Sequence, residues 1–195
     1  MIVGYLILVI SFAMSSCIPF SLYFEDGMLW PFIISILVTA TAGASLIWFK
    51  PPKEKKIGKR EGYLVVAFGW LSMALASTLP YMFSGTTTVF ADAIFESVSG
   101  LTTTGATIFT DIESIAPSVL FWRSLTQWIG GMGIIVLTIA IFPLLGIGGV
   151  ELFTAEAPGP TKDKISPRIQ VTAKRLWMIY VGLTAMLFFV LWAAG

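Results

Sequence analysis

The sequence predicts an all-α integral membrane protein with five transmembrane helices and one short re-entrant helix followed by a loop. Hydrophobic residues make up 56% of the 195 residues and charged residues only 12%, and the mean hydropathy is +0.88. Soluble domains carry about 25% charged residues, so this composition indicates a membrane protein. Five apolar runs are long enough to cross a bilayer, and a polar stretch rich in Thr and Gly lies between the third and the fourth.

The five apolar runs define the predicted spans. They cover residues 1–24, 28–49, 62–83, 118–145 and 176–194. Pro19 is expected to interrupt the first span, whereas Pro31 is tolerated near the start of the second. Cys17 could end a lipoprotein signal, but no Lys or Arg precedes it. We therefore expect Cys17 to pack between helices.

The basic residues predict the orientation of the spans. Eleven of the twelve Lys and Arg residues follow the second or the fourth span, in residues 50–60 and 162–175. Because positively charged loops stay in the cytoplasm, we expect a multi-pass membrane protein with a cytoplasmic N-terminus. The polar stretch then enters from outside. Basic runs can also bind nucleic acid, but in a chain with several spans the topological explanation is favoured, and no nucleic-acid partner is expected.

The composition argues against an enzyme. The sequence has no histidine, which excludes histidine-based triads, proton shuttles and metal sites, and its one cysteine cannot form an internal disulfide. Acidic residues are expected on the outer side: Glu25 and Asp26 between the first two spans, and Asp92, Glu96, Asp111 and Glu113 between the third and fourth. Without a recognisable nucleophile beside them, they suggest attraction of cations rather than catalysis. We expect no organic cofactor.

The polar stretch, residues 95–107, is predicted to be re-entrant. Non-helical backbone reaches membrane depth only where it is buried in protein or lines a water-filled cavity, so the stretch predicts an ion path. The alternative is an ordinary loop between helices. Residues 89–99 form a helix candidate of about 16 Å, which is roughly half of a ~30 Å hydrocarbon core. Such a helix can enter the membrane but cannot span it.

Local signals predict how this short helix begins and ends. Thr86–Thr88 offer hydroxyl caps at its start, Asp92 lies in its first turn, and Gly100 supplies the permissive conformation that ends it. The carbonyl end then faces the membrane interior, where its partial negative charge favours a dehydrating cation. An extended path over residues 102–105 would offer carbonyl oxygens in place of a hydration shell, with Gly105 allowing close approach.

Arg123 lies inside the fourth predicted span, where an ionised group is costly and usually has a partner. Glu96 lies in the last turn of the short helix, and both residues are expected at a similar depth. We predict that they pair behind the loop. The alternative is that Arg123 snorkels to the outer headgroups. Gly130, Gly131 and Gly133 in the same span are expected to permit close helix packing.

Two segments resemble a known family. Residues 93–107 (AIFESVSGLTTTGAT) resemble the pore helix and filter of the Trk/Ktr/HKT superfamily of potassium transporters, in particular its TrkH-like members. Residues 121–135 (FWRSLTQWIGGMGII) resemble the helix that follows that filter. The resemblance implies a filter of Thr103, Thr104 and Gly105 in which the backbone carbonyls of Thr103 and Thr104 bind K+. The residues implied to support the filter are Glu96, Gly100, Thr102, Ala106 and Arg123.

The resemblance also implies a location in the bacterial plasma (inner) membrane and a domain organisation. In this family four successive units, each a helix, a pore helix with filter and a second helix, surround one axis. Residues 62–145 would form one such unit, preceded by two extra helices and a basic loop in residues 1–61. Residues 146–195 would comprise a cytoplasmic connector and the first helix of a second unit. The further filters are expected from the same longer chain or from other copies.

Three functional classes are consistent with the sequence. The first is uptake or symport of potassium or other monovalent cations through a filter of backbone carbonyls. The second is a subunit of a small homotetrameric cation channel, and the third is a non-conducting scaffold or regulatory subunit. Expected partners are K+, membrane lipids and further pore units. The resemblance adds a cytoplasmic nucleotide-binding regulatory subunit, which the loops at residues 50–61 and 146–168 are placed to meet.

Overall fold

The computed structural model describes residues 2–48, 59–144 and 165–194, and within these ranges it is helical with no strand. Side chains are not described for residues 59–61, 134–144 and 165–170. The helices are α1 (Ile2–Ser15), α2 (Cys17–Phe24), α3 (Leu29–Trp48), α4 (Lys59–Phe83), α5 (Phe90–Leu101), α6 (Pro117–Leu144) and α8 (Ile165–Ala194). The predicted basic loop and connector, at residues 50–58 and 146–164, lie outside the described residues.

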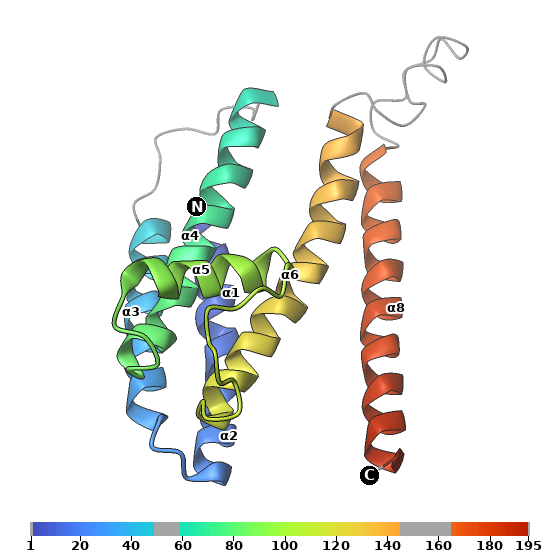
Figure 1. Cartoon of the computed structure of the whole chain (residues 1–195). Coiled ribbons are helices and arrows are strands. Elements are labelled where there is room, and N and C mark those ends of the chain that lie inside the picture. The colour runs from blue at the N-terminus through green and yellow to red at the C-terminus, as the bar shows by residue number, and fades with distance from the viewer. Residues whose placement is uncertain (1, 49–58, 145–164, 195) are drawn as a thin grey trace, which may run out of the picture. The chain divides into compact units, whose positions relative to one another are not determined.

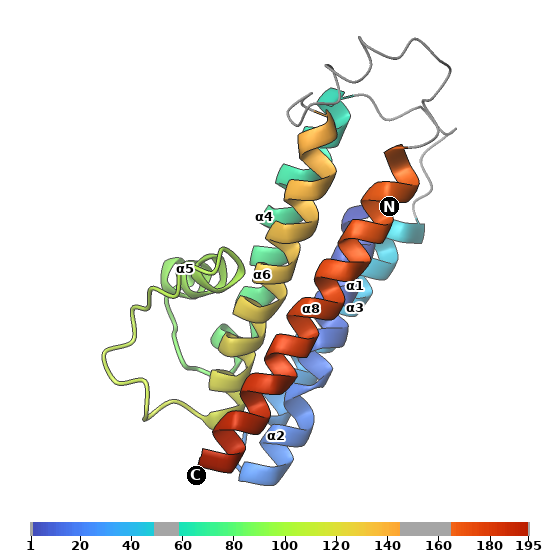
Figure 2. The same cartoon turned by 90° about the vertical axis from the view of Figure 1, so that its right-hand side faces the viewer.

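The chain forms two compact units, Met1–Gly130 and Gly131–Gly195. In the first unit α1 contacts α3 and α4, and α4 also contacts α5. Figure 1 shows α1, α3 and α4 side by side, with α5 lying crosswise to them. Figure 2 views α5 nearly along its axis and shows the following loop returning to the start of α6. The second unit contains the end of α6 and the long helix α8.

Four described segments are long and apolar enough to cross a membrane: Ile2–Phe24, Leu29–Trp48, Gly62–Phe83 and Val171–Ala194. They match the first, second, third and fifth predicted spans to within a few residues. The fourth, α6, is a helix of 28 residues, but it is not among these four candidates. The count of five spans therefore stays a prediction, as do the domain boundaries at residues 61 and 145.

The first span is interrupted at Ser16 rather than at Pro19. Helix α1 ends at Ser15 and α2 begins at Cys17, so Pro19 lies in the first turn of α2. A proline ring clashes with the carbonyl four residues earlier and its nitrogen has no proton to donate, which affects Ser15. Pro19 therefore accounts for the end of α1 at Ser15, four residues before the proline.

Helices α1 and α3 pack through two glycines. A Cβ atom added to Gly4 would lie 2.8 Å from the carbonyl oxygen of Gly43, and one added to Gly43 would lie 3.0 Å from that of Gly4. Ser11 of α1 donates a hydrogen bond to the carbonyl of Ile36 in α3 at 3.0 Å. Small residues bring backbones together in this way where lipid supplies no hydrophobic drive for association.

The core of the first unit lies beneath α5. Its fully buried side chains include Met14, Cys17, Phe32, Tyr81 and Trp122, so α1, α2, α3, α4 and α6 all contribute to it. Cys17 is buried, as expected. The outer faces are apolar as well, with Phe12 81% exposed and Trp48 85% exposed. Helices that are apolar all round suit a lipid environment.

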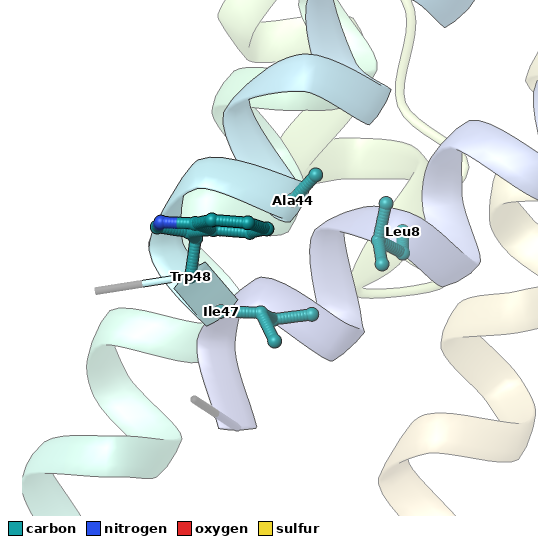
Figure 3. Close-up of a pocket in the computed structure, with 4 residues that line it drawn as sticks. All are labelled: Leu8, Ala44, Ile47 and Trp48. Atoms are coloured by element: carbon teal, nitrogen blue, oxygen red, sulfur yellow. The ribbon is translucent and has the colours of Figure 1, made fainter. Parts of the chain in front are cut away.

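An open apolar depression lies where α1 and α3 meet near the end of α3. Its lining residues are Leu8, Ala44, Ile47 and Trp48 (Figure 3). No charged side chain is among them. We interpret the depression as part of the lipid-facing surface of the helix pair.

The glycine contact gives a first prediction. Replacing Gly43 with Val should destabilise the protein by about 1 to 3 kcal/mol, because the new side chain overlaps the backbone of α1. Thermal unfolding in detergent measures the effect. The matched control is Gly62→Val, since Gly62 also lies in a helix but has no heavy atom within 4 Å of an added Cβ. Equal shifts in the two variants would contradict close α1–α3 packing.

Candidate functional site

Helix α5 is amphipathic and presents one polar face to the protein. It begins after Val89, whose backbone is extended, and Asp92 lies in its first turn as predicted. Ala93, Glu96, Ser97 and Gly100 are buried, at the spacing of one helix face. The opposite face carries apolar residues that are about half exposed. The sequence of α5 therefore fixes which side chains point inward and which remain available to a neighbour.

The predicted hydroxyl caps do not cap the first turn. The backbone N–H of Val89, the residue before α5, donates to Thr87 Oγ1 at 3.2 Å, and no side chain caps the helix itself. Ser84 and Thr86 share a hydrogen bond of 2.6 Å in the preceding turn. The threonine run thus stabilises the turn that leads into α5.

Helix α5 does not end at Gly100, contrary to the prediction. It continues through Leu101, Thr102 follows in a helical conformation, and Thr103 takes a left-handed conformation with φ of 58°. The predicted extended path at Thr102 and Thr103 is therefore wrong. Thr103 and Thr104 donate backbone hydrogen bonds to the carbonyls of Gly100 and Ser99 at 2.9 and 3.0 Å. These bonds satisfy two of the carbonyls in the last turn of the helix.

Gly100 is required for packing instead. A Cβ atom at Gly100 would lie 2.4 Å from Thr126 Oγ1 on α6. On the facing helix, a Cβ atom at Gly130 would lie 2.1 Å from the carbonyl oxygen of Leu101. Two glycines therefore allow the end of α5 to lie directly against α6, with the backbones meeting at Gly130, which agrees with the close approach predicted for that residue.

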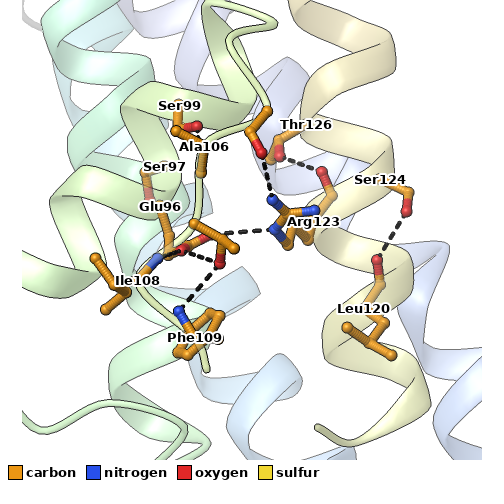
Figure 4. A network of polar contacts seen from close by, with 12 residues as sticks. Glu96, Ser97, Ser99, Ala106, Ile108, Phe109, Leu120, Arg123, Ser124 and Thr126 are labelled. Carbon is orange, nitrogen blue, oxygen red and sulfur yellow. Dashed lines mark hydrogen bonds and ion pairs between the residues drawn. The ribbon is translucent and has the colours of Figure 1, made fainter. Parts of the chain in front are cut away.

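The carboxylate of Glu96 is completely buried and accepts three hydrogen bonds. Thr107 Oγ1 donates to Oε1 at 2.6 Å and the backbone N–H of Ile108 donates to the same oxygen at 2.8 Å. Arg123 Nε donates to Oε2 at 3.1 Å. One carboxylate therefore joins α5, the following loop and α6 (Figure 4). The expectation that Glu96 belongs to a group of exposed acidic residues that attract cations on the outer side is therefore wrong.

Arg123 extends the same network to the loop. Its Nη2 donates to the carbonyl oxygen of Gly105 at 3.1 Å while its Nε bonds Glu96, and its side chain is only 16% exposed. The predicted ion pair is present, and Arg123 does not snorkel away from the protein. A guanidinium can hold two acceptors at once because its donors lie in one rigid plane.

The loop carbonyls fall into two groups. The carbonyl of Gly105 accepts from Arg123, and that of Ala106 accepts from Ser99 Oγ at 2.6 Å, so both are held from within the protein. Within the described part of the chain, no hydrogen bond reaches the carbonyl oxygens of Thr102, Thr103 or Thr104. Residues 102–106 are all exposed. Among the described residues, the first three carbonyls thus have no hydrogen-bond partner at the carboxyl end of α5.

The structure adds three residues that the sequence reasoning missed: Ser99, Thr107 and Thr126. Ser99 lies three positions after Glu96 on the same helix face, a spacing that could have indicated its role. Thr107 and Thr126 act through contacts between segments distant in sequence, and no local pattern marks them. The predicted acidic residues Asp111 and Glu113 are exposed, and Asp92 is half-buried.

The comparisons agree on one family. A family model described as TrkH, cation transport protein, matches residues 31–194. The Trk system potassium uptake proteins TrkH of Halomonas elongata and Escherichia coli K12 are 43% and 45% identical over 100% and 97% of this chain. The crystal structure of the potassium transporter TrkH from Vibrio parahaemolyticus matches with a TM-score of 0.83 and 36% identity over the whole chain. The chain spans 41% and 40% of those two curated relatives and 38% of the crystallised one.

The buried ion pair gives a second prediction. Glu96→Gln and Arg123→Gln should each destabilise the protein by about 3 to 5 kcal/mol, because each leaves its partner buried without a counter-charge. The double variant should cost less than the sum of the two single variants, with a coupling of about 1 to 3 kcal/mol. Denaturant or thermal unfolding in detergent measures the cycle.

The control cycle pairs Glu96→Gln with Ser124→Ala. Ser124 is the next residue of α6, and its hydroxyl donates to the carbonyl of Leu120 on the same helix, at 3.0 Å. That cycle should be additive. A charge swap is a poor test here, because an arginine at position 96 would face the donors from Thr107 and Ile108. Additivity in the Glu96–Arg123 cycle would argue against the contact.

Proposed function

Since the chain belongs to the TrkH family of cation transport proteins, we propose that it forms one part of the pore through which a membrane protein takes up potassium. The chain spans about two fifths of its relatives, so the activity of the whole protein is part of this proposal. The names of those relatives describe potassium uptake rather than catalysis, and we assign no enzymatic step.

The free carbonyls of Thr102, Thr103 and Thr104 carry the proposal. They lie at the carboxyl end of α5, where aligned peptide dipoles give a partial negative charge. A potassium ion that leaves water needs oxygen atoms to replace its hydration shell, and backbone carbonyls supply them. In this proposal Thr103 and Thr104 bind K+, while Gly105 shapes the loop.

The backbone of the loop supports this assignment. Thr103 has φ of 58° and Gly105 has φ of 73°, both in the left-handed region. A β-branched residue such as Thr103 rarely adopts that conformation. Such a strained backbone persists only where the surrounding structure holds it, and it is common at functional sites. The surrounding structure here is the network of Glu96, Arg123 and Ser99. We infer that these three residues hold the loop in its ion-binding form.

Arg123 is compatible with a cation path because it is paired. Its charge lies within 3.1 Å of the Glu96 carboxylate, so the pair presents little net charge at a distance. Its bond to Gly105 turns that carbonyl toward α6. The arginine therefore supports the loop from behind and leaves the field at the ion to the free carbonyls and the dipole of α5.

One pore loop surrounds only one side of an ion. The exposed loop and the half-exposed Phe95 and Val98 of α5 offer a surface for the neighbours that would complete the ring. Further units of a longer chain fit the length of the relatives. A homotetramer of small subunits and a non-conducting scaffold are the alternatives. Cytoplasmic regulatory subunits, the bacterial plasma membrane and a cytoplasmic N-terminus remain proposals from the charge pattern and the family.

The filter assignment gives a third prediction. Gly105→Ser, in the full-length protein that contains this chain, should lower the preference for potassium over sodium. A serine in the left-handed conformation costs about 1 to 2 kcal/mol, and relief of that strain would move the carbonyl away from Arg123. Rubidium and sodium uptake in cells that lack other potassium uptake systems measures the effect.

The matched control is Gly85→Ser. Gly85 has φ of 71° and open space around an added Cβ, as Gly105 does, but it lies in the turn before α5. The two variants should lose similar stability, and only Gly105→Ser should change ion preference. An unchanged preference at normal membrane levels would remove Gly105 from the site.

A fourth prediction concerns the 195 residues expressed alone. A monomer of this segment should not conduct, because one loop leaves most of the ion unsolvated and exposes unpaired backbone groups to lipid. Light scattering gives the mass of the purified segment, and liposome flux gives its activity. A folded monomer that carries potassium would contradict the shared pore, and a conducting tetramer would favour the homotetrameric channel.

A further inference from the structure

Asp26 connects the first helices of the chain to the start of α6. Its Oδ2 accepts the backbone N–H of Ser118 at 3.0 Å, across 92 positions of sequence. Its Oδ1 accepts the hydroxyl of Ser21 at 2.7 Å and the backbone N–H of Met28 at 3.0 Å. Both oxygens are thus engaged, and the carboxylate lies at the positive end of α6. Asp26 is therefore built into a junction of α2, α3 and α6.

The environment of Asp26 favours its charged form. Burial alone would raise the pKa of its carboxyl, but the hydrogen bonds from Ser118, Ser21 and Met28 outweigh burial and hold the pKa below the usual 3.8. Asp26 is therefore ionised at neutral pH. An ionised acceptor makes stronger hydrogen bonds than a neutral one, which suits a group that fixes a helix end.

Successive residues of α6 then contact three different helices. Phe121 stacks on Phe20 of α2 with ring centroids 3.8 Å apart. Trp122 is fully buried and donates from Nε1 to the carbonyl of Ser77 in α4 at 3.2 Å. Arg123 bonds Glu96 of α5. Because consecutive helical positions point about 100° apart, any rotation or shift of α6 would disturb all three contacts together.

We propose that Asp26 is a positioning residue for the ion filter: by holding the amide of Ser118 it fixes where α6 begins, and so where Arg123 meets Glu96 and the carbonyl of Gly105. This inference rests on the proposed function. Arg123 follows Ser118 by five residues, or about 7.5 Å of rigid helix. A displacement of the first turn of α6 would therefore move Arg123, and with it the loop carbonyl that Arg123 holds, by a similar distance. The helices before the pore unit thus contribute to ion selection without touching the ion.

The test compares Asp26→Asn, Asp26→Glu and Glu25→Gln in the full-length protein. Asparagine cannot accept at both positions that the carboxylate serves, whereas glutamate keeps the charge on a longer side chain. Glu25 is the exposed neighbour in the same turn. Glu25→Gln therefore removes one negative charge from the turn but leaves intact the hydrogen bonds that Asp26 makes with Ser118, Ser21 and Met28. The measured quantity is the ratio of sodium to rubidium uptake. This ratio does not depend on how many folded molecules reach the membrane.

We expect the ratio to rise about threefold or more in Asp26→Asn, as for a mutation that acts through a packed network, and to rise less in Asp26→Glu. Glu25→Gln should keep the wild-type ratio. A wild-type ratio in Asp26→Asn would overturn the proposal, and so would equal rises in Asp26→Asn and Glu25→Gln, since the cause would then be the charge alone.

A milder variant covers the case in which Asp26→Asn does not reach the membrane. Ser21→Ala removes one of the three donors to Asp26 and leaves the carboxylate in place. A wild-type ratio in both Ser21→Ala and Asp26→Glu would then overturn the proposal, and a raised ratio in either would support it. A wild-type protein without rubidium uptake would contradict the proposed function itself. A wild-type protein that prefers rubidium, and whose uptake ratio does not change when Asp26 is replaced, would contradict only this inference.

Discussion

The arrangement of the site depends on the buried carboxylate of Glu96. A charge removed from water costs several kcal/mol unless each lone pair finds a donor and a counter-charge lies near. Here Thr107, Ile108 and Arg123 meet that requirement, and each belongs to a different part of the chain from Glu96. The penalty therefore acts as a geometric constraint, because the loop and α6 must occupy the positions that satisfy the carboxylate.

The constraint explains how a cationic side chain can lie beside a proposed cation path. Arg123 donates hydrogen bonds to two acceptors, the Glu96 carboxylate and the Gly105 carbonyl. If the carboxylate were absent, the guanidinium would both repel an approaching ion and lose the partner that orients it. With the carboxylate present, the pair is close to neutral, and the free carbonyls of Thr102, Thr103 and Thr104 supply the negative end of α5. Under the proposed function, the charged pair shapes the loop and neutral dipoles would face the ion.

The sequence predicted the features that depend on local pattern. Of the five spans predicted from apolar runs, four coincide with helices long and apolar enough to cross a membrane. A short helix is present where one was predicted, and the Glu96–Arg123 pair followed from two charges at one expected depth. The helix end was wrong because the role of Gly100 depends on Thr126, a neighbour only in the folded chain. The contact between Asp26 and Ser118 crosses 92 positions and has no local signal. Membership of the TrkH-like family was recognisable because the motifs at residues 93–107 and 121–135 are themselves local.

Two kinds of contact fix α5 against α6, and they constrain different directions. Gly100 leaves room for the side chain of Thr126 and Gly130 leaves room for the backbone of Leu101, so the two glycines set how closely the helices approach. They do less to set the register along α6, because Gly130 meets the backbone of Leu101 and Gly100 meets the short side chain of Thr126. The Glu96–Arg123 pair supplies that register, because a bond of 3.1 Å between charged groups tolerates little displacement along either helix. The position of the free carbonyls then follows from both contacts: the glycines fix their depth in the protein, and the ion pair fixes their place along α6.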